Sequence, residues 1–354
     1  MMQVKDYRKI AKKKLSKSIF DYIDGAAEDE ITYRANSTSF NHYFFLTTVL
    51  QDVSKIETEF ELLKTKFAMP LMFAPTAFHK LVEPQKGEIS TAIAAKTCQL
   101  PMVISSMSSV PFEDIIQQSN HDDLWLQIYL YKDKAITSSL IETAHNIGIK
   151  ALMITVGVPY SGIRYRDQKN QFKVPDSLFP KHYQTSSMAM SIGAFAAQYL
   201  NPGITWDDIV WLKKQTHLPI ILKGILNPLD AEKAYHAGIQ GIVVSNHGGR
   251  QLDCTIPSIL ALPDIIKIIN GRIPVLLDGG IRRASDIFKA YALGADAVMI
   301  GRPVLWALAV DGQSSLMRMV MSLKNDFETI MGLTGCTNLS DVRAFQENIK
   351  YVKI

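Results

Sequence analysis

Two stretches of the chain repeat one pattern: LPIILKGILNPLDAEKAYHAGIQGIVVSN at residues 218–246 and IPVLLDGGIRRASDIFKAYALGADAVMIGR at residues 273–302. In each copy an apolar run ends in a charged residue and a glycine. A helical period then follows from an aspartate, and an Ala-Tyr pair leads through a glycine to the next apolar run. A strand–helix–strand unit that occurs twice is what a barrel of alternating strands and helices contains.

Eight short apolar runs are spaced along the chain from about residue 68. They are LMFA (71–74), MVIS (102–105), LWLQIY (124–129), ALMIT (151–155), IILK (220–223), GIVVS (241–245), VLLD (275–278) and AVMIG (297–301). Unalternated apolar runs indicate strands buried on both faces of a parallel sheet. Eight strands close a (β/α)8 TIM barrel, which is the fold we predict. The competing open doubly wound sheet lacks its GxGxxG signature after an early strand.

We expect residues 1–354 to form a single domain, because one barrel often uses such a length. Residues 1–66 indicate helices and then a short extended stretch, which we expect to cap one barrel end. Residues 165–205 form a long insertion after the fourth strand. Its middle, SSMAMSIGAFAAQYL (186–200), is apolar enough for a lid helix or a membrane-touching patch, and we favour the lid.

Composition narrows the class of protein. Hydrophobic residues make up 47% and charged residues 20%, which is enough for a large core. A net charge of +4 without a basic stripe among aromatics argues against nucleic-acid binding. The three cysteines form no CxxC pair, which suits a reducing compartment and argues against a metal site. The first residues lack the apolar core of a signal peptide and the terminal YVKI is no peroxisomal address, so we expect a cytoplasmic protein.

Polar residues and glycines follow each predicted strand, and barrels of this kind carry their active sites at those ends. In chain order they are Pro75, Thr76 and Ala77; Ser105; Gln127 and Tyr129; Thr155, with Arg164 beyond; Lys223; Ser245, His247 and Arg250; Asp278, Gly279, Gly280 and Arg282; Gly301 and Arg302. Taken singly, each has an ordinary structural explanation. Their joint occurrence at successive strand ends predicts a site.

The residues at the ends of the last two predicted strands favour the binding of an anion. Gly279, Gly280 and Gly301 let backbone N–H groups approach closely, and Arg282 and Arg302 add positive charge. Barrels often build a phosphate site from the loops after strands seven and eight. The sequence therefore predicts phosphate binding there.

The residues at the ends of the earlier predicted strands favour the binding of a planar heterocycle. The side chains of Ser105, Gln127 and Thr155 could form hydrogen bonds with its edge. Lys223 could place positive charge near a ring that becomes anionic on reduction.

The stretch SNHGGRQLD (245–253) combines a titratable ring with a permanent cation. The Arg250 guanidinium can bind a carboxylate through two parallel hydrogen bonds. The His247 imidazole can accept a proton at neutral pH.

Together these motifs resemble the FMN-dependent 2-hydroxy acid oxidase and dehydrogenase family, which includes glycolate oxidase, lactate oxidase, flavocytochrome b2 and mandelate dehydrogenase. The resemblance runs from FDYIDGAAEDE near the start to FETIMGLTGC near the end. SNHGGRQLD is highly specific, and QIYLYKD, LPIILKG and PVLLDGGIRR reinforce it. The resemblance implies FMN as cofactor, held by Pro75, Thr76, Ala77, Ser105, Gln127, Thr155, Lys223, Ser245, Asp278, Gly279, Gly280, Arg282, Gly301 and Arg302.

The resemblance also implies oxidation of an L-2-hydroxy acid to the 2-oxo acid. Arg164 and Arg250 would bind the substrate carboxylate, the hydroxyls of Tyr22 and Tyr129 would assist, and His247 would be the general base. Whether His247 removes the hydroxyl proton or the α-proton stays open. Oxygen or a quinone could reoxidise the flavin, a peripheral membrane contact stays open, and relatives are commonly homotetramers.

The chain departs from the family pattern at one position with a chemical consequence. Where the family reads TVDTP, this chain has Thr155, Val156, Gly157, Val158 and Pro159. The family's aspartate pairs with the catalytic histidine, and an opposite charge raises a histidine pKa. Without that acid we expect slower flavin reduction, or catalysis shifted to higher pH.

Two alternatives to this enzyme remain open. One is a flavin-binding protein whose catalysis has decayed and which acts as a binding or regulatory module. The other is a phosphate-binding barrel without flavin, of the aldolase or isomerase type. Within the enzyme reading, Met107 and Ser161 replace larger residues of glycolate oxidase, so we expect longer or aromatic 2-hydroxy acids as substrates.

Overall fold

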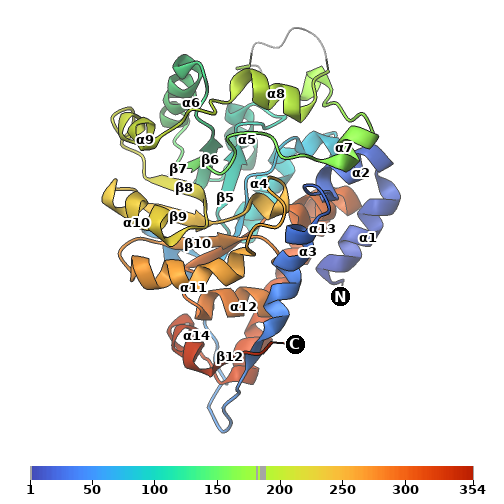
Figure 1. Cartoon of the computed structure of the whole chain (residues 1–354). Helices are drawn as coiled ribbons and strands as arrows, with labels where there is room; N and C mark the ends of the chain where they lie inside the picture. The colour runs from blue at the N-terminus through green and yellow to red at the C-terminus, as the bar shows by residue number, and fades with distance from the viewer. Residues whose placement is uncertain (1, 181, 184–188, 354) are drawn as a thin grey trace.

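The eight predicted strands form one closed parallel barrel (Figure 1). A computed structural model describes residues 2–180, 182–183 and 189–353. The barrel strands are β4 (Leu71–Phe73), β5 (Met102–Ser105), β6 (Leu124–Ile128), β7 (Leu152–Thr155), β8 (Ile220–Ile225), β9 (Gly241–Val244), β10 (Val275–Asp278) and β11 (Ala297–Ile300). Each pairs with its sequence neighbours, and β11 pairs with β4 to close the ring. The (β/α)8 prediction is confirmed.

Strand register sets the level of the functional residues. Ser105 at the end of β5 pairs with Gln127 of β6, and Thr155 at the end of β7 pairs with Lys223 of β8. Each strand is apolar and buried until this level is reached. The first polar residues therefore emerge together at the carboxyl end of the barrel.

Strand β8 is two residues longer than predicted. Its pairing with β9 shifts between Lys223 and Ile225, and Gly224 between them has φ +112°. A glycine accepts this backbone conformation at no steric cost, whereas other residues do not. The bulge lies directly beside Lys223.

Helices surround the barrel in the order expected for strand–helix units (Figure 1). They are α4 (Glu88–Thr97), α5 (Phe112–Ser119), α6 (Lys134–Asn146), α9 (Trp206–Lys213), α10 (Pro228–His236), α11 (Ser258–Ile269), α12 (Ala284–Ala292), α13 (Arg302–Thr334) and α14 (Leu339–Ala344). The sequence repeat corresponds to β8–α10–β9 and β10–α12–β11. Among the described residues, no helix combines the length and apolarity that a membrane crossing needs.

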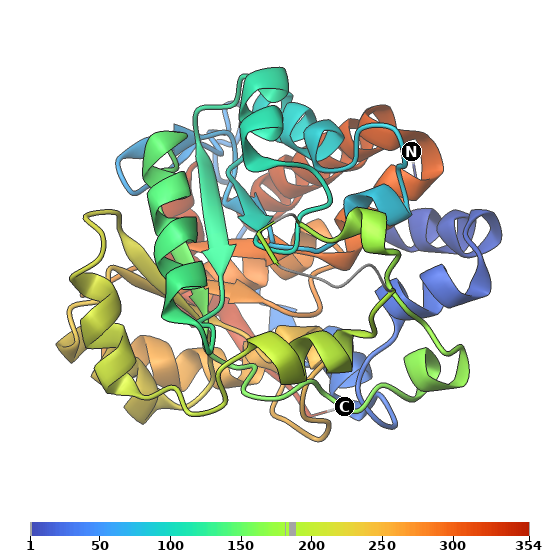
Figure 2. The same cartoon turned by 90° about the horizontal axis from the view of Figure 1, so that it is seen from above.

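The helical part of the N-terminal segment reaches the carboxyl end of the barrel. It comprises α1 (Val4–Lys14), α2 (Lys17–Asp24), α3 (Ile31–Thr38) and the single turn η1 (Ser39–His42). The blue helices α1 and α2 lie beside α13 in Figures 1 and 2. Helix α3 packs on the turn η4 (His247–Gly249).

The extended part of the same segment lies at the opposite barrel end. The hairpin β2 (Phe60–Leu62) and β3 (Thr65–Phe67) precedes β4, and the Ala68 N–H donates to the carbonyl of Gln99 just before β5. Strand β1 (Tyr43–Phe45) pairs with β12 (Ile349–Tyr351), which the turn η5 (Phe345–Asn348) precedes. The N-terminal segment therefore contacts both ends of the barrel. Alternate side chains of β2 and β3, those of Phe60, Leu62 and Phe67, are buried there.

The insertion after β7 contains α7 (Tyr165–Lys169), the turn η3 (Asp176–Leu178) and α8 (Ile192–Tyr199); residues 186–188 of its apolar run lie outside the described residues. Figure 2 shows it, in yellow-green, on the side toward which the teal strand arrow points. Phe195 and Tyr199 of α8 are buried, whereas Ala194 and Ala197 are exposed. The bulky side chains that suggested membrane contact face inward, which favours the lid helix.

Candidate active site

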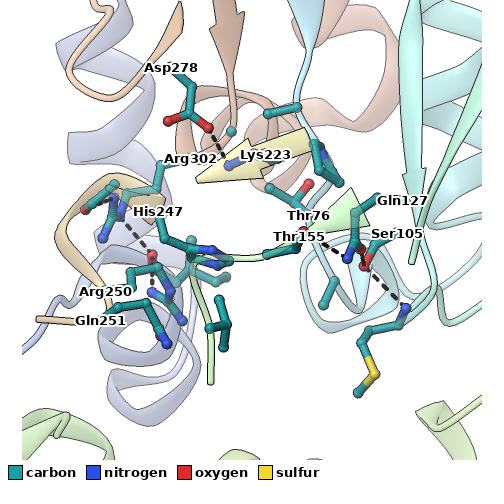
Figure 3. Close-up of a pocket in the computed structure, with 18 of the residues that line it drawn as sticks. Thr76, Ser105, Gln127, Thr155, Lys223, His247, Arg250, Gln251, Asp278 and Arg302 are labelled. Carbon is teal, nitrogen blue, oxygen red and sulfur yellow. Dashed lines mark hydrogen bonds and ion pairs between the residues drawn. The ribbon is translucent and has the colours of Figure 1, made fainter. Parts of the chain in front are cut away.

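One hollow at the carboxyl ends of the strands collects the predicted site residues (Figure 3). Those lining it are Tyr22, Pro75, Thr76, Ala77, Ser105, Met107, Gln127, Tyr129, Thr155, Arg164, Lys223, His247, Arg250, Asp278, Gly279, Gly280, Arg282, Gly301 and Arg302. Ser245 lies behind this lining, where its Oγ accepts from Lys223 Nζ at 2.9 Å and from the His247 N–H at 3.1 Å. Its place is therefore to orient Lys223 and His247.

Three strand ends present a row of hydrogen-bonding groups on one side of the hollow. The Ser105 hydroxyl donates to Gln127 Oε1 at 3.2 Å, and Gln127 Nε2 donates to Thr155 Oγ1 at 2.9 Å. All three side chains are buried. Because each group is held by its neighbour, the row is fixed in position before any ligand binds.

Lys223 and Asp278 form a buried ion pair on the other side of the hollow (Figure 3). Lys223 Nζ lies 2.6 Å from Asp278 Oδ2. The second carboxylate oxygen, Asp278 Oδ1, is buried and has no hydrogen-bond partner in the structure. Buried acceptors are rarely left unpaired, so we expect this oxygen to accept a hydrogen bond from a bound ligand.

The loops after β10 and β11 build a basic recess. Gly280 has φ +89°, and a Cβ there would lie 2.1 Å from the Asn36 carbonyl oxygen. Arg302 donates to the carbonyls of Gly25 at 2.7 Å and Gly248 at 2.9 Å, and neither Arg302 nor Arg282 forms an ion pair within the described part of the chain. Burial, then the charge of Arg250, lowers the pKa of Arg302 to about 9. Two partly buried guanidiniums without an ion-paired carboxylate favour binding of an anion.

Two further guanidiniums lie beside the tyrosines. Arg250 Nη1 donates to the Tyr22 carbonyl at 2.8 Å, and its guanidinium lies 5.3 Å from the centroid of the Tyr22 ring. Arg164 Nη1 lies 3.7 Å from Asp167 Oδ2, whereas its buried Nε has no hydrogen-bond partner among the described residues. Burial, then Arg250, lowers the pKa of Arg164 to about 10. The pair can therefore bind a carboxylate.

His247 is a partly buried imidazole surrounded by cations. Burial, then the charges of Lys223, Arg250, Arg164 and Arg302, hold its pKa well below the ordinary value of 6.5. The ring is therefore neutral at pH 7 and able to accept a proton. Its backbone has φ +55°, an unusual conformation for a residue with a side chain.

Comparison with known proteins agrees with this geometry. The FMN-dependent dehydrogenase family matches residues 11–347. The chain belongs to that family. It is 42% identical over 347 residues to a peroxisomal (S)-2-hydroxyacid oxidase of Arabidopsis thaliana, covering 97% of this chain and 95% of the relative. It is 41% identical over 348 residues to an L-lactate oxidase of Nostoc, covering 95% of each. The crystal structure of mandelate oxidase with (S)-4-hydroxymandelic acid superimposes with a TM-score of 0.94, at 35% identity and full coverage of both chains.

The cofactor of an FMN-dependent dehydrogenase fits this hollow. The row of Ser105, Gln127 and Thr155 offers partners for the polar edge of a flavin ring, and Asp278 Oδ1 offers an unused acceptor. The recess with Arg282 and Arg302 offers a place for the phosphate. Both halves of FMN therefore have matching protein groups.

Several lining residues of this family member were missed by the sequence interpretation. They are Ile23, Phe78, Val158, Ile192, Phe195, Ala196, Leu200, Gln251 and Leu305. Most are apolar, and an apolar residue that lines a site has the same sequence signal as one that fills a core. The apolar run at 186–200 was the sequence signal that could have indicated some of them. The spacing of its apolar residues does not, however, predict which face of the helix lines the pocket.

A pair of buried amides behind the site was also missed. Asn36 Nδ2 donates to Asn246 Oδ1 and Asn246 Nδ2 donates to Asn36 Oδ1, both at 2.8 Å. This reciprocal pair joins α3 to the His247 turn. Because 210 residues separate its members, only the folded chain reveals it.

Proposed function

We propose that the protein oxidises an L-2-hydroxy acid to the 2-oxo acid with FMN, using His247 as the general base. One observation carries the proposal: the neutral, partly buried imidazole of His247 lines the same hollow as two guanidiniums and the FMN-fitting groups. The relatives named as 2-hydroxy acid, lactate and mandelate oxidases support it.

Substrate binding follows from the unused hydrogen-bonding capacity of the site. Arg164 keeps a buried Nε without a partner, and Arg250 lies close enough to lower the pKa of Arg164. A carboxylate between the two guanidiniums removes their mutual repulsion. Tyr22 and Tyr129 stay protonated, because burial raises the pKa of both hydroxyls, and so they can donate hydrogen bonds to the substrate.

Proton removal is the task of His247. The neutral ring accepts a proton from the substrate and becomes an imidazolium beside Lys223, Arg250 and Arg164. The substrate carboxylate is then the anion that offsets this charge. Bound FMN supplies the two-electron acceptor for the oxidation.

Anaerobic mixing tests the proposal. The FMN-loaded protein is mixed with 2-hydroxy acids from glycolate and lactate to long-chain and aromatic ones, and the visible flavin band is followed. We expect one or more acids to bleach it, and His247→Gln to slow that bleaching by about 10²-fold or more. A yellow protein that no acid bleaches would instead support the decayed binding module.

The acceptor, assembly and location are further parts of the proposal. The names of the relatives as oxidases favour oxygen over a quinone, which oxygen consumption during turnover tests. We propose a homotetramer, which light scattering tests. We propose the cytoplasm as location, although some plant relatives are named peroxisomal, and fractionation of cells that express the full chain tests it.

A further inference from the structure

The lining of the pocket contains one set of polar side chains and one set of apolar side chains that bear on substrate binding, which we call the polar half and the apolar half. The polar half contains Tyr22, Tyr129, Arg164, His247 and Arg250. The apolar half contains Phe78, Met107, Val158, Ile192, Phe195, Ala196 and Leu200. Four of these apolar residues come from α8 and the residue that follows it; we call Ile192, Phe195, Ala196 and Leu200 the α8 wall.

Helix α8 presents one defined face to the pocket. Ser191 begins the helix by accepting a hydrogen bond from the Ala194 N–H at 3.2 Å. Phe195 and Ala196 are buried, whereas Ala194 and Ala197 on the other face are exposed. The inward direction of the α8 wall is therefore set by the helical period.

The end of α8 is fastened to the segment that follows Tyr129. The Lys132 N–H donates to the Tyr199 carbonyl at 2.9 Å, and the Asn201 N–H donates to the Leu130 carbonyl at 3.2 Å. Leu200 forms an antiparallel bridge with Tyr131 between these two bonds. The α8 wall is thus held next to the substrate-binding tyrosine by backbone contacts.

A buried hydroxyl cluster fixes the insertion from a second side. Tyr183 Oη lies 2.6 Å from Tyr131 Oη, which lies 3.0 Å from Ser106 Oγ. The Tyr183 ring packs edge-on against Phe195 with centroids 4.9 Å apart. Because all three hydroxyls are buried and paired, the cluster holds Phe195 in one place.

From this arrangement we propose that the α8 wall is the specificity-determining surface, and that it selects 2-hydroxy acids with an apolar side chain larger than methyl. The proposal rests on the proposed function. The substrate carboxylate and hydroxyl are taken by the polar half, so the substituent meets the α8 wall. Its side chains contain no hydrogen-bond donor or acceptor, so a charged substituent there would be left unpaired.

The first test compares substrates on the FMN-loaded enzyme. We expect kcat/KM to rise about fourfold for each methylene buried, through glycolate, lactate, 2-hydroxybutyrate and 2-hydroxy-4-methylpentanoate. Malate, with its charged substituent, should be no better than lactate. A preference for glycolate or malate over the larger apolar acids overturns the inference.

The second test fills the pocket from α8. Ala196→Leu adds bulk on the buried face, and Ala197→Leu makes the same change one residue away on the exposed face. We expect Ala196→Leu to lower kcat/KM for 2-hydroxy-4-methylpentanoate about tenfold or more. The kcat/KM for glycolate should change by less than about threefold. Ala197→Leu should change neither. Equal losses for both acids in Ala196→Leu overturn the inference.

A binding measurement separates the inference from the chemistry. Calorimetry with the non-reacting carboxylates acetate, butyrate and phenylacetate should show tighter binding of the larger ones, and Ile192→Thr should reduce that difference. Binding without such an order overturns the inference. If the wild-type flavin is bleached by the panel without an apolar preference, only the α8 proposal fails. If no acid bleaches it, the proposed function fails, and this inference with it.

Discussion

His247 is the residue whose electrostatics most affect the reaction. Its pKa lies well below 6.5, because burial and then neighbouring cations disfavour the imidazolium. The reaction requires the neutral form of His247, and a lowered pKa keeps the ring neutral down to a lower pH. The expected shift of catalysis to higher pH therefore has the wrong sign. We predict that the acid limb of kcat/KM, which reports the free enzyme, lies below pH 6.5.

A carboxylate at position 157 should reverse this behaviour. A Cβ at Gly157 would lie 3.3 Å from Gly224 Cα, a tight contact that a shift of a few tenths of an ångström relieves. If the new acid pairs with His247, as the family resemblance implies, Gly157→Asp should move the acid limb up by about one pH unit and speed flavin reduction.

Gly157→Asn is the matched control, since it has the same shape without the charge. Identical pH profiles and reduction rates in the two folded, FMN-loaded variants would contradict this account of His247.

At the scale of an element, the bulge of β8 is the feature that positions Lys223. Gly224 has φ +112°, and a Cβ there would lie 2.7 Å from the Gly157 nitrogen. We predict that Gly224→Ala destabilises the protein by about 2 kcal/mol or more and weakens FMN binding, because the bulge must move away from Gly157 in the loop after β7. Denaturant unfolding and flavin titration measure the two effects.

Gly271→Ala is the control for this prediction. Gly271 has φ +71° but no atom within 4 Å of its ideal Cβ, so the variant carries backbone strain without a clash. It should cost about 1 kcal/mol and leave FMN binding unchanged. Equal losses of stability in the two variants would mean that the close contact between Gly224 and Gly157 contributes nothing to the effect of Gly224→Ala.

Across the molecule, positive charge is concentrated in the site, and the protein's own ion pairs at Lys223 and Arg164 neutralise only part of it. Arg164, Lys223, Arg250, Arg282 and Arg302 line one hollow, and Asp278 is the carboxylate among the lining residues. A bound dianionic phosphate relieves part of this repulsion. FMN should therefore stabilise the fold, by about 2.7 kcal/mol at a concentration 100 times its Kd.

Thermal unfolding of the apoprotein with FMN or riboflavin tests this prediction. Riboflavin has the same ring system without the phosphate, so it should raise the melting temperature less than FMN does at equal concentration. Equal shifts would show that Arg282 and Arg302 do not contribute through the phosphate.

The amino-acid sequence alone was enough to predict the barrel and most of the residues of the site. Eight apolar runs specify buried parallel strands, and the residue that ends each run must emerge at the same barrel end, because every strand runs in the same direction. Ser105, Gln127, Thr155 and Lys223 could therefore be grouped without a structure.

Contacts between groups that are far apart along the chain could be identified only in the folded protein. The sequence does not show that the α2 carbonyls of Tyr22 and Ile23 accept hydrogen bonds from Arg250 and Arg302, or that Asp278 Oδ1 stays unpaired among the described residues. Nor does it show which face of α8 meets the pocket. Such contacts depend on packing between segments far apart in sequence, whereas strand order and polarity are local properties of the chain.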